Sequence, residues 1–99
     1  MRIGILGAGQ LGRMLALAGI PLECEFRFLD PVPNSPASVA GVQTAGDYMD
    51  AEAQKRFAEG CDAITWEFEN VPVEAARALQ KYAPVYPAPE ALEAYSYSR

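Results

Sequence analysis

The most informative absence from this chain of 99 residues is histidine, which does not occur at all. Without an imidazole, the chain cannot form His-based catalytic triads, most catalytic zinc sites or the most common general base. Lysine is found only at Lys55 and Lys81, and neither follows a glycine-rich loop, so there is no P-loop. We therefore expect neither catalytic residues nor metal ligands within these 99 residues.

Cysteine and long apolar segments are also scarce. The two cysteines, Cys24 and Cys61, lack metal-type spacing and are typical of buried apolar thiols in a reducing compartment, although the sequence leaves their pairing open. The first apolar run begins at residue 3, is too short to span a bilayer and is preceded by no signal peptide. These features predict a cytoplasmic protein without a membrane partner.

Positive charge is scarce as well. The formal net charge is −5, and no run of Lys or Arg occurs. Because phosphate neutralisation supplies most of the affinity for nucleic acid, an acidic chain of this kind argues against a nucleic-acid partner. Hydrophobic residues make up 51% of the chain and charged residues 21%, which is ordinary globular composition, and the length is that of one small domain over residues 1–99.

Strand-like and helical patterns alternate along the chain. Apolar or alternating runs typical of strands lie at residues 1–6, 25–29, 42–44, 62–66 and 85–86. Helical patterns lie at residues 10–18, at 50–59 with Asp50 as the expected cap, at about 71–82 with Pro72 in the first turn, and from Pro89 onward. Residues 31–38 are rich in proline and serine, which favours a loop. This alternation predicts an α/β, Rossmann-like fold in which a parallel sheet has helices on both faces.

The first candidate site is the glycine turn Gly7-x-Gly9-x-x-Gly12, which follows a predicted strand and precedes a predicted helix. Gly7 permits a tight exit from the strand, Gly9 lets the backbone approach a ligand, and Gly12 lets the helix pack on the sheet. Free N–H groups at a helix start favour an anion. The alternative is a packing turn that binds no ligand.

Asp30 lies eighteen positions after Gly12. In nicotinamide-binding domains an acid at about this position accepts hydrogen bonds from the ribose hydroxyls, so these two features alone indicate NAD. The alternative is that Asp30 ends a strand before Pro31, because Asp-Pro is common in turns.

A second polar cluster follows the apolar strand that ends at Trp66. If the strand continued, Glu67 and Glu69 would point to the same side, where carboxylates could accept hydrogen bonds from sugar hydroxyls. The alternative is that Glu69 or Asn70 caps a helix beginning at Val71. We assign Glu67 to a ligand and the other two mainly to structure. Arg13, one turn into the first helix, is either a further phosphate contact or a solvated side chain.

Three segments together resemble the N5-carboxyaminoimidazole ribonucleotide synthase family, whose members are also described as the ATPase subunit of phosphoribosylaminoimidazole carboxylase. The segments are Gly-Gln-Leu-Gly-Arg-Met at 9–14, Phe-Leu-Asp-Pro at 28–31 and Trp-Glu-Phe-Glu-Asn-Val-Pro at 66–72. The resemblance extends over nearly the whole chain, and the third segment is its most specific part. It departs from the family at residues 95–99, where an acid often precedes the final Arg.

The resemblance implies that this chain is the amino-terminal, pre-ATP-grasp domain of a longer enzyme. An ATP-grasp domain and a small carboxyl-terminal domain would follow, and ATP and Mg²⁺ would bind outside this chain. The family's reaction carboxylates 5-aminoimidazole ribonucleotide with ATP and bicarbonate in purine (IMP) biosynthesis. The residues implied for the ribonucleotide are Gly7, Gly9, Gln10, Leu11 and Gly12 for its 5′-phosphate, and Glu67 for its ribose hydroxyls. These 99 residues alone would be inactive.

Other functions stay open at this point. The chain could be the first half of an NAD-binding Rossmann domain of an oxidoreductase, although such a domain normally continues into a second mononucleotide half. An interaction module without enzymatic activity would need a broad exposed apolar patch. The sequence does not fix the oligomeric state, and a homodimer is among the states it leaves open.

Overall fold

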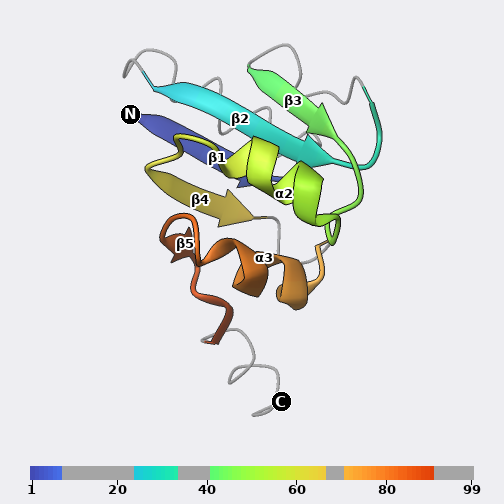
Figure 1. Cartoon of the computed structure of the whole chain (residues 1–99). Coiled ribbons are helices and arrows are strands. Elements are labelled where there is room, and N and C mark those ends of the chain that lie inside the picture. The colour runs from blue at the N-terminus through green and yellow to red at the C-terminus, as the bar shows by residue number, and fades with distance from the viewer. Residues whose placement is uncertain (8–23, 34–40, 67–70, 91–99) are drawn as a thin grey trace.

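The structure, a computed structural model, describes residues 1–7, 24–33, 41–66 and 71–90. Its centre is a sheet of five parallel strands in the order β3-β2-β1-β4-β5 (Figure 1). The strands are β1 (Arg2–Leu6), β2 (Glu25–Asp30), β3 (Val42–Ala45), β4 (Ala63–Trp66) and β5 (Val85–Tyr86). The predicted α/β fold with a parallel sheet is confirmed, and each strand lies within one residue of its predicted bounds.

Two helices, α2 (Ala51–Ala58) and α3 (Val73–Leu79), lie on one face of this sheet (Figure 1). The helix predicted over residues 10–18 lies outside the described residues. The last helix begins at Pro89 as predicted, and its continuation after Glu90 lies outside the described residues. The other face of the sheet also carries buried side chains, namely Ile5, Phe26 and Phe28, which form a second apolar cluster. The central strand β1 contributes Leu6 to the one apolar cluster and Ile5 to the other, so it is buried on both faces, as is typical of a parallel sheet.

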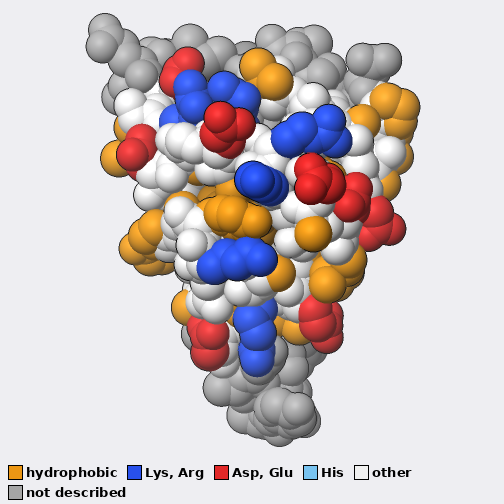
Figure 2. Space-filling view, in the orientation of Figure 1, with side chains coloured by type: hydrophobic (Ala, Val, Ile, Leu, Met, Phe, Trp, Pro, Cys, Tyr) orange, Lys and Arg blue, Asp and Glu red, His pale blue; other side chains and the backbone are white. Residues whose placement is uncertain are grey.

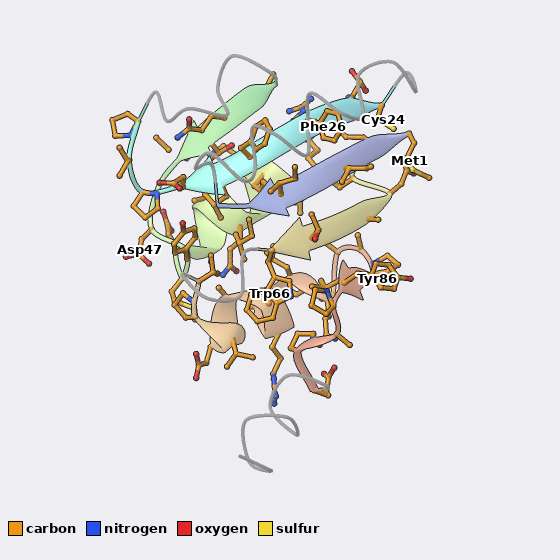
Figure 3. All side chains as sticks on the ribbon, turned by 180° about the vertical axis from the view of Figure 1, so that it is seen from behind. Met1, Cys24, Phe26, Asp47, Trp66 and Tyr86 are labelled. Atoms are coloured by element: carbon orange, nitrogen blue, oxygen red, sulfur yellow. The ribbon has the colours of Figure 1, made fainter. Side chains whose placement is uncertain are left out.

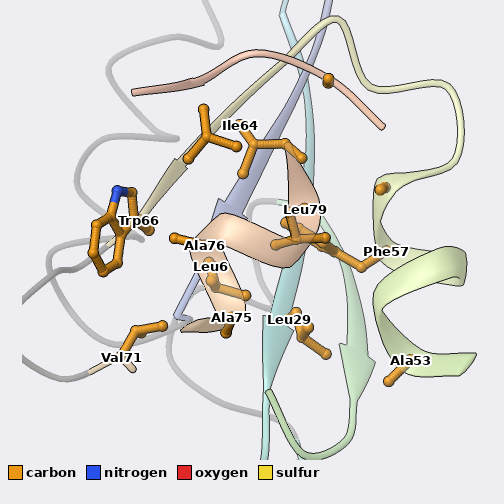
Figure 4. Close-up of a cluster of buried hydrophobic side chains, with 13 residues drawn as sticks. Leu6, Leu29, Ala53, Phe57, Ile64, Trp66, Val71, Ala75, Ala76 and Leu79 are labelled. Atoms are coloured by element: carbon orange, nitrogen blue, oxygen red, sulfur yellow. The ribbon is translucent and has the colours of Figure 1, made fainter. Parts of the chain in front are cut away.

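The larger core lies between the sheet and the two helices (Figure 4). Phe57 of α2 and Leu79 of α3 are fully buried there, against Leu6, Leu29 and Ile64 of the sheet. Phe57 therefore points inward from α2, toward the sheet. This core holds the three central strands in register, which fixes the relative positions of their carboxyl ends.

The predicted bounds of α3 are too wide. The helix begins at Val73 and ends at Leu79, whereas the sequence indicated residues 71–82. Pro72 has an extended backbone with ψ of 137°, so it occupies the N-cap position rather than the first turn. At the other end, the Tyr82 N–H donates to the Leu79 carbonyl in a turn, and Pro84 disfavours helical geometry for the residue before it.

Asp50 caps α2 as the sequence predicted, because its Oδ1 accepts a hydrogen bond of 3.2 Å from the Glu52 N–H. We expect Asp50→Ala to lower the free energy of unfolding by about 1 kcal/mol, since an N–H of the first turn loses its acceptor. Urea denaturation of both proteins would measure this difference. Asp50→Asn keeps an acceptor oxygen and should retain most of the stability. Equal losses in the two variants would show that the hydrogen bond is not the cause.

Candidate site at the carboxyl edge of the sheet

The carboxyl ends of β1, β2 and β4 lie side by side at one edge of the sheet. Leu6 of β1 pairs with Leu29 of β2 and with Trp66 of β4, so the three strands end level with one another. The chain order places β2 on one side of β1 and β4 on the other, and ligands of open parallel sheets bind at such switch points. Gly7 follows β1 and residue 67 follows β4, so the two predicted binding segments leave from adjacent strand ends.

Gly7 has the backbone that a sharp exit from β1 requires. Its φ is 107°, a value that side-chain-bearing residues rarely adopt, and the residue is buried. Its N–H donates to the Leu29 carbonyl at 2.7 Å. Because this N–H is already bonded, Gly7 shapes the turn, and any N–H groups offered to a phosphate would belong to the residues that follow it.

Asp30 is engaged by its own chain. Its Oδ1 accepts from the Val32 N–H at 2.9 Å, and its Oδ2 accepts from the Tyr48 hydroxyl at 3.3 Å. The first bond closes a turn directly after β2. This agrees with the alternative interpretation of the sequence, in which Asp30 ends a strand before Pro31. The second bond ties this turn to the segment before α2. This geometry favours a structural role for Asp30 over a ribose contact of the nicotinamide type.

The end of β4 is anchored by the side chain of Trp66. Trp66 is labelled in Figures 3 and 4, and Figure 4 shows its ring among the side chains of the larger core. Only 5% of this residue is exposed, and its indole Nε1 donates to the Pro87 carbonyl at 2.8 Å. No local pattern in the sequence indicated this contact, or that between Tyr48 and Asp30, because the partners lie 21 and 18 residues apart. Both contacts fix chain segments at the carboxyl edge.

Most predicted site residues lie outside the described part of the chain. These are Gly9, Gln10, Leu11, Gly12, Arg13, Glu67, Glu69 and Asn70. Their roles stay predictions. The structure does bear on the alternative in which Glu69 or Asn70 caps α3. The N-cap of this helix is Pro72, so neither residue occupies the N-cap position. In the described part of the chain, no group of three or more His, Cys, Asp or Glu side chains could hold a metal ion.

The opposite, amino edge of the sheet is tied together by Arg2. Its guanidinium forms an ion pair with Glu25 at 3.2 Å and donates to the Glu59 carbonyl at 3.1 Å. On the face that carries α2 and α3, basic side chains alternate with acidic and apolar ones (Figure 2). This face therefore shows no continuous basic surface.

The two cysteines lie near the same amino edge. Figure 3 shows Cys24 beside Met1, at the end of the sheet away from Asp47. Both cysteines belong to the described residues, and they are thiols rather than the two halves of a disulfide. The strands that follow Cys24 and Cys61 flank β1 on opposite sides, a separation of about 9–10 Å, which exceeds the reach of a disulfide. Burial raises the pKa of the Cys61 thiol, an effect partly offset by Arg2 and Arg27, so this thiol stays protonated at neutral pH.

No helix in the described part of the chain has the length and apolar character needed to cross a membrane.

The comparisons with known proteins agree with the parallel fold. Residues 1–95 match the family described as the ribonucleotide synthetase preATP-grasp domain. Over 92 residues the chain is 49% identical to N5-carboxyaminoimidazole ribonucleotide synthase of Pseudomonas aeruginosa, a match that covers 93% of this chain and 26% of that protein.

Solved structures give the same result. The crystal structure of N5-carboxyaminoimidazole ribonucleotide synthetase from Thermus thermophilus superposes with a TM-score of 0.87 at 59% identity, over 92% of this chain and 25% of that one. The Staphylococcus aureus N5-carboxyaminoimidazole synthetase complexed with ADP gives a TM-score of 0.81 at 30% identity, over 91% and 24% of the two chains. This chain therefore spans about a quarter of the length of these relatives. The match over residues 1–95 shows that the chain belongs to the ribonucleotide synthetase preATP-grasp domain family.

Proposed function

We propose that this chain is the ribonucleotide-binding domain of an N5-carboxyaminoimidazole ribonucleotide synthase. The observation that carries the proposal is the pairing of Leu6 with Trp66. It places the exits of β1 and β4 next to each other, and the glycine turn and Glu67 follow these two exits. The similarity to synthases of that name supports the same substrate class.

The two segments offer complementary chemistry to a nucleoside monophosphate. A turn that follows a strand and leads into a predicted helix presents backbone N–H groups, which favour a phosphate dianion. A carboxylate near that turn accepts hydrogen bonds from vicinal ribose hydroxyls. In this proposal Gln10 and Leu11, with Gly9 and Gly12, receive the 5′-phosphate, and Glu67 receives the ribose of 5-aminoimidazole ribonucleotide. Gly7 contributes the turn geometry, because its own N–H is bonded to Leu29.

The chemical steps would belong to the rest of a longer protein. Bicarbonate attacks the γ-phosphorus of ATP, giving carboxyphosphate and ADP. The exocyclic amine of 5-aminoimidazole ribonucleotide then attacks the carboxyl carbon of carboxyphosphate. Phosphate leaves with the electrons of the broken C–O bond, and the amine nitrogen loses a proton. We assign ATP and Mg²⁺ to an ATP-grasp domain beyond these residues, which would be the intramolecular partner of this domain. The relative solved with ADP supports nucleotide binding by the longer protein.

This division of labour has two consequences for the chain itself. Its part is to bind and orient the ribonucleotide, so the 99 residues alone should not hydrolyse ATP. We place the protein in the cytoplasm, since a chain whose two cysteines are thiols suits a reducing compartment.

Glu67→Gln tests the proposed ribose contact. We expect the dissociation constant of the full-length protein for 5-aminoimidazole ribonucleotide to rise about tenfold to a hundredfold, because a hydrogen bond to a charged acceptor contributes about 1.5–3 kcal/mol. Isothermal titration calorimetry would measure this change.

Glu74→Gln, which neutralises an exposed acid on α3, is the matched control and should leave the affinity unchanged. Equal affinity of the wild type and Glu67→Gln for the ribonucleotide would contradict the assignment. A parallel titration with NAD distinguishes the oxidoreductase alternative, which requires NAD binding that weakens in Asp30→Ala.

A further inference from the structure

Trp66 is the last residue of β4 and immediately precedes Glu67. It is the only tryptophan of the chain. Although it lies at the edge where the strands end, only 5% of it is exposed. Its ring belongs to the same core cluster as Leu6, Ile64 and Val71 (Figure 4). The direction of the Trp66 side chain is therefore fixed by packing on the side of the sheet that carries α3.

The indole N–H adds a connection beyond the last backbone pair of the two strands. β4 and β5 pair at Ile64 with Val85 and at Thr65 with Tyr86, so Trp66 and Pro87 follow this last pair. The Trp66 Nε1 donates to the Pro87 carbonyl at 2.8 Å. A side-chain hydrogen bond thus ties the end of β4 to the chain beyond β5.

On its other side, Trp66 is paired with Leu6, the residue before the Gly7 turn. The last residue of β4 is therefore fixed from three directions: by β1, by the core and by Pro87. The next residue along the chain is Glu67.

We propose that Trp66 is a positioning residue for substrate binding, whose indole–Pro87 hydrogen bond holds the end of β4 so that Glu67 is directed at the ribose of the ribonucleotide. This inference rests on the proposed function. Trp66 acts through Glu67 and does not itself touch the substrate. Its loss should therefore weaken ribonucleotide binding and leave the chemical step, which other residues perform, nearly unchanged.

The test is Trp66→Phe in the full-length enzyme, which keeps an aromatic ring in the core and removes the donor. We expect the KM for 5-aminoimidazole ribonucleotide to rise about three- to tenfold, the range that corresponds to one hydrogen bond, with kcat within about twofold of the wild type. Site-specific replacement of Trp66 by 3-benzothienylalanine, which exchanges N–H for sulfur at nearly constant shape, should give the same KM change. This second variant decides the question if the phenylalanine variant does not fold.

Ile64→Val is the matched control, because Ile64 lies on the same strand, in the same cluster, and is 1% exposed. It should lower the melting temperature without changing KM. If the variants at position 66 raise KM no more than Ile64→Val does, the positioning role is refuted.

A double-mutant cycle separates this inference from the proposed function. If Trp66 acts through Glu67, adding Trp66→Phe to Glu67→Gln should raise KM no further. If Trp66→Phe keeps its full effect in that background, Trp66 does not act through Glu67 and the inference fails while the proposed function stands. If Glu67→Gln alone has no effect on KM, the proposed function itself fails.

Discussion

Replacing Phe57 by alanine is expected to lower the free energy of unfolding by about 3–5 kcal/mol, the usual cost of truncating a buried aromatic ring to a methyl group. Phe57 is fully buried between α2 and the sheet. Its ring fits against Gly4 so closely that a Cβ added at Gly4 would lie 2.8 Å from Phe57 Cζ. Because neighbouring side chains could move into that space only by leaving their own contacts, the cavity would stay largely unfilled.

Urea denaturation followed by the fluorescence of Trp66, the only tryptophan of the chain, would measure this loss. Tyr86→Ala is the control, because it also truncates an aromatic ring but one that is 61% exposed. We expect the control to change the free energy of unfolding by no more than about 0.5 kcal/mol. Similar losses in both variants would mean that Phe57 does not occupy the core as the structure shows.

Replacing Gly7 by valine is expected to lower the free energy of unfolding by about 2–6 kcal/mol, the sum of a backbone and a packing effect. A β-branched residue at a φ of 107° carries backbone strain of about 1–3 kcal/mol. Gly7 is also buried, so the added side chain would overpack its surroundings at a further cost of about 1–3 kcal/mol. The strand end could relieve the strain only by breaking the hydrogen bond from the Gly7 N–H to Leu29.

Comparison with Gly7→Ala separates the two contributions. An alanine at position 7 carries the backbone strain but adds only one methyl group to the buried surroundings. The free energy of unfolding of Gly7→Ala in urea denaturation should therefore lie between those of the wild type and the valine variant. A neutral Gly7→Ala would contradict the backbone argument. Because the predicted phosphate turn continues directly from Gly7, both variants should also bind 5-aminoimidazole ribonucleotide more weakly in calorimetry at temperatures where they are fully folded.

Local patterns in the sequence predicted those elements whose signals are local. The alternation of Phe26 and Phe28 with polar residues indicated β2, and Asp50 indicated the start of α2, because strand burial and helix capping depend on residues a few positions apart. The end of α3 was predicted too late, since apolar spacing continues to Tyr82 while the chain already turns toward Pro84. Here proline geometry overrides the periodic pattern.

At the candidate site, the sequence supplied the residue types, and the structure supplied the arrangement of the strands that precede them. The motif from Gly7 to Gly12 and the acids after Trp66 can be found by inspection, but that the preceding strand ends are neighbours depends on β4 pairing with β1 across a sequence separation of about sixty residues. Asp30 had two interpretations in the sequence, a ribose contact and a strand-ending turn. Its bonds to Val32 and to the distant Tyr48 favour the structural one.

The sequence by itself determined which residue types are available to this protein: a glycine turn between a strand and a predicted helix, carboxylates directly after Trp66, and no histidine. These follow from residue type and short spacing, which need no knowledge of distant contacts. Only the tertiary structure decided that β1 and β4 are neighbours, that the Gly7 N–H is bonded to Leu29, and that Trp66 is fixed to Pro87. Each of these contacts joins residues at least twenty positions apart, and such contacts are set by burial of the shared core, which no local pattern encodes.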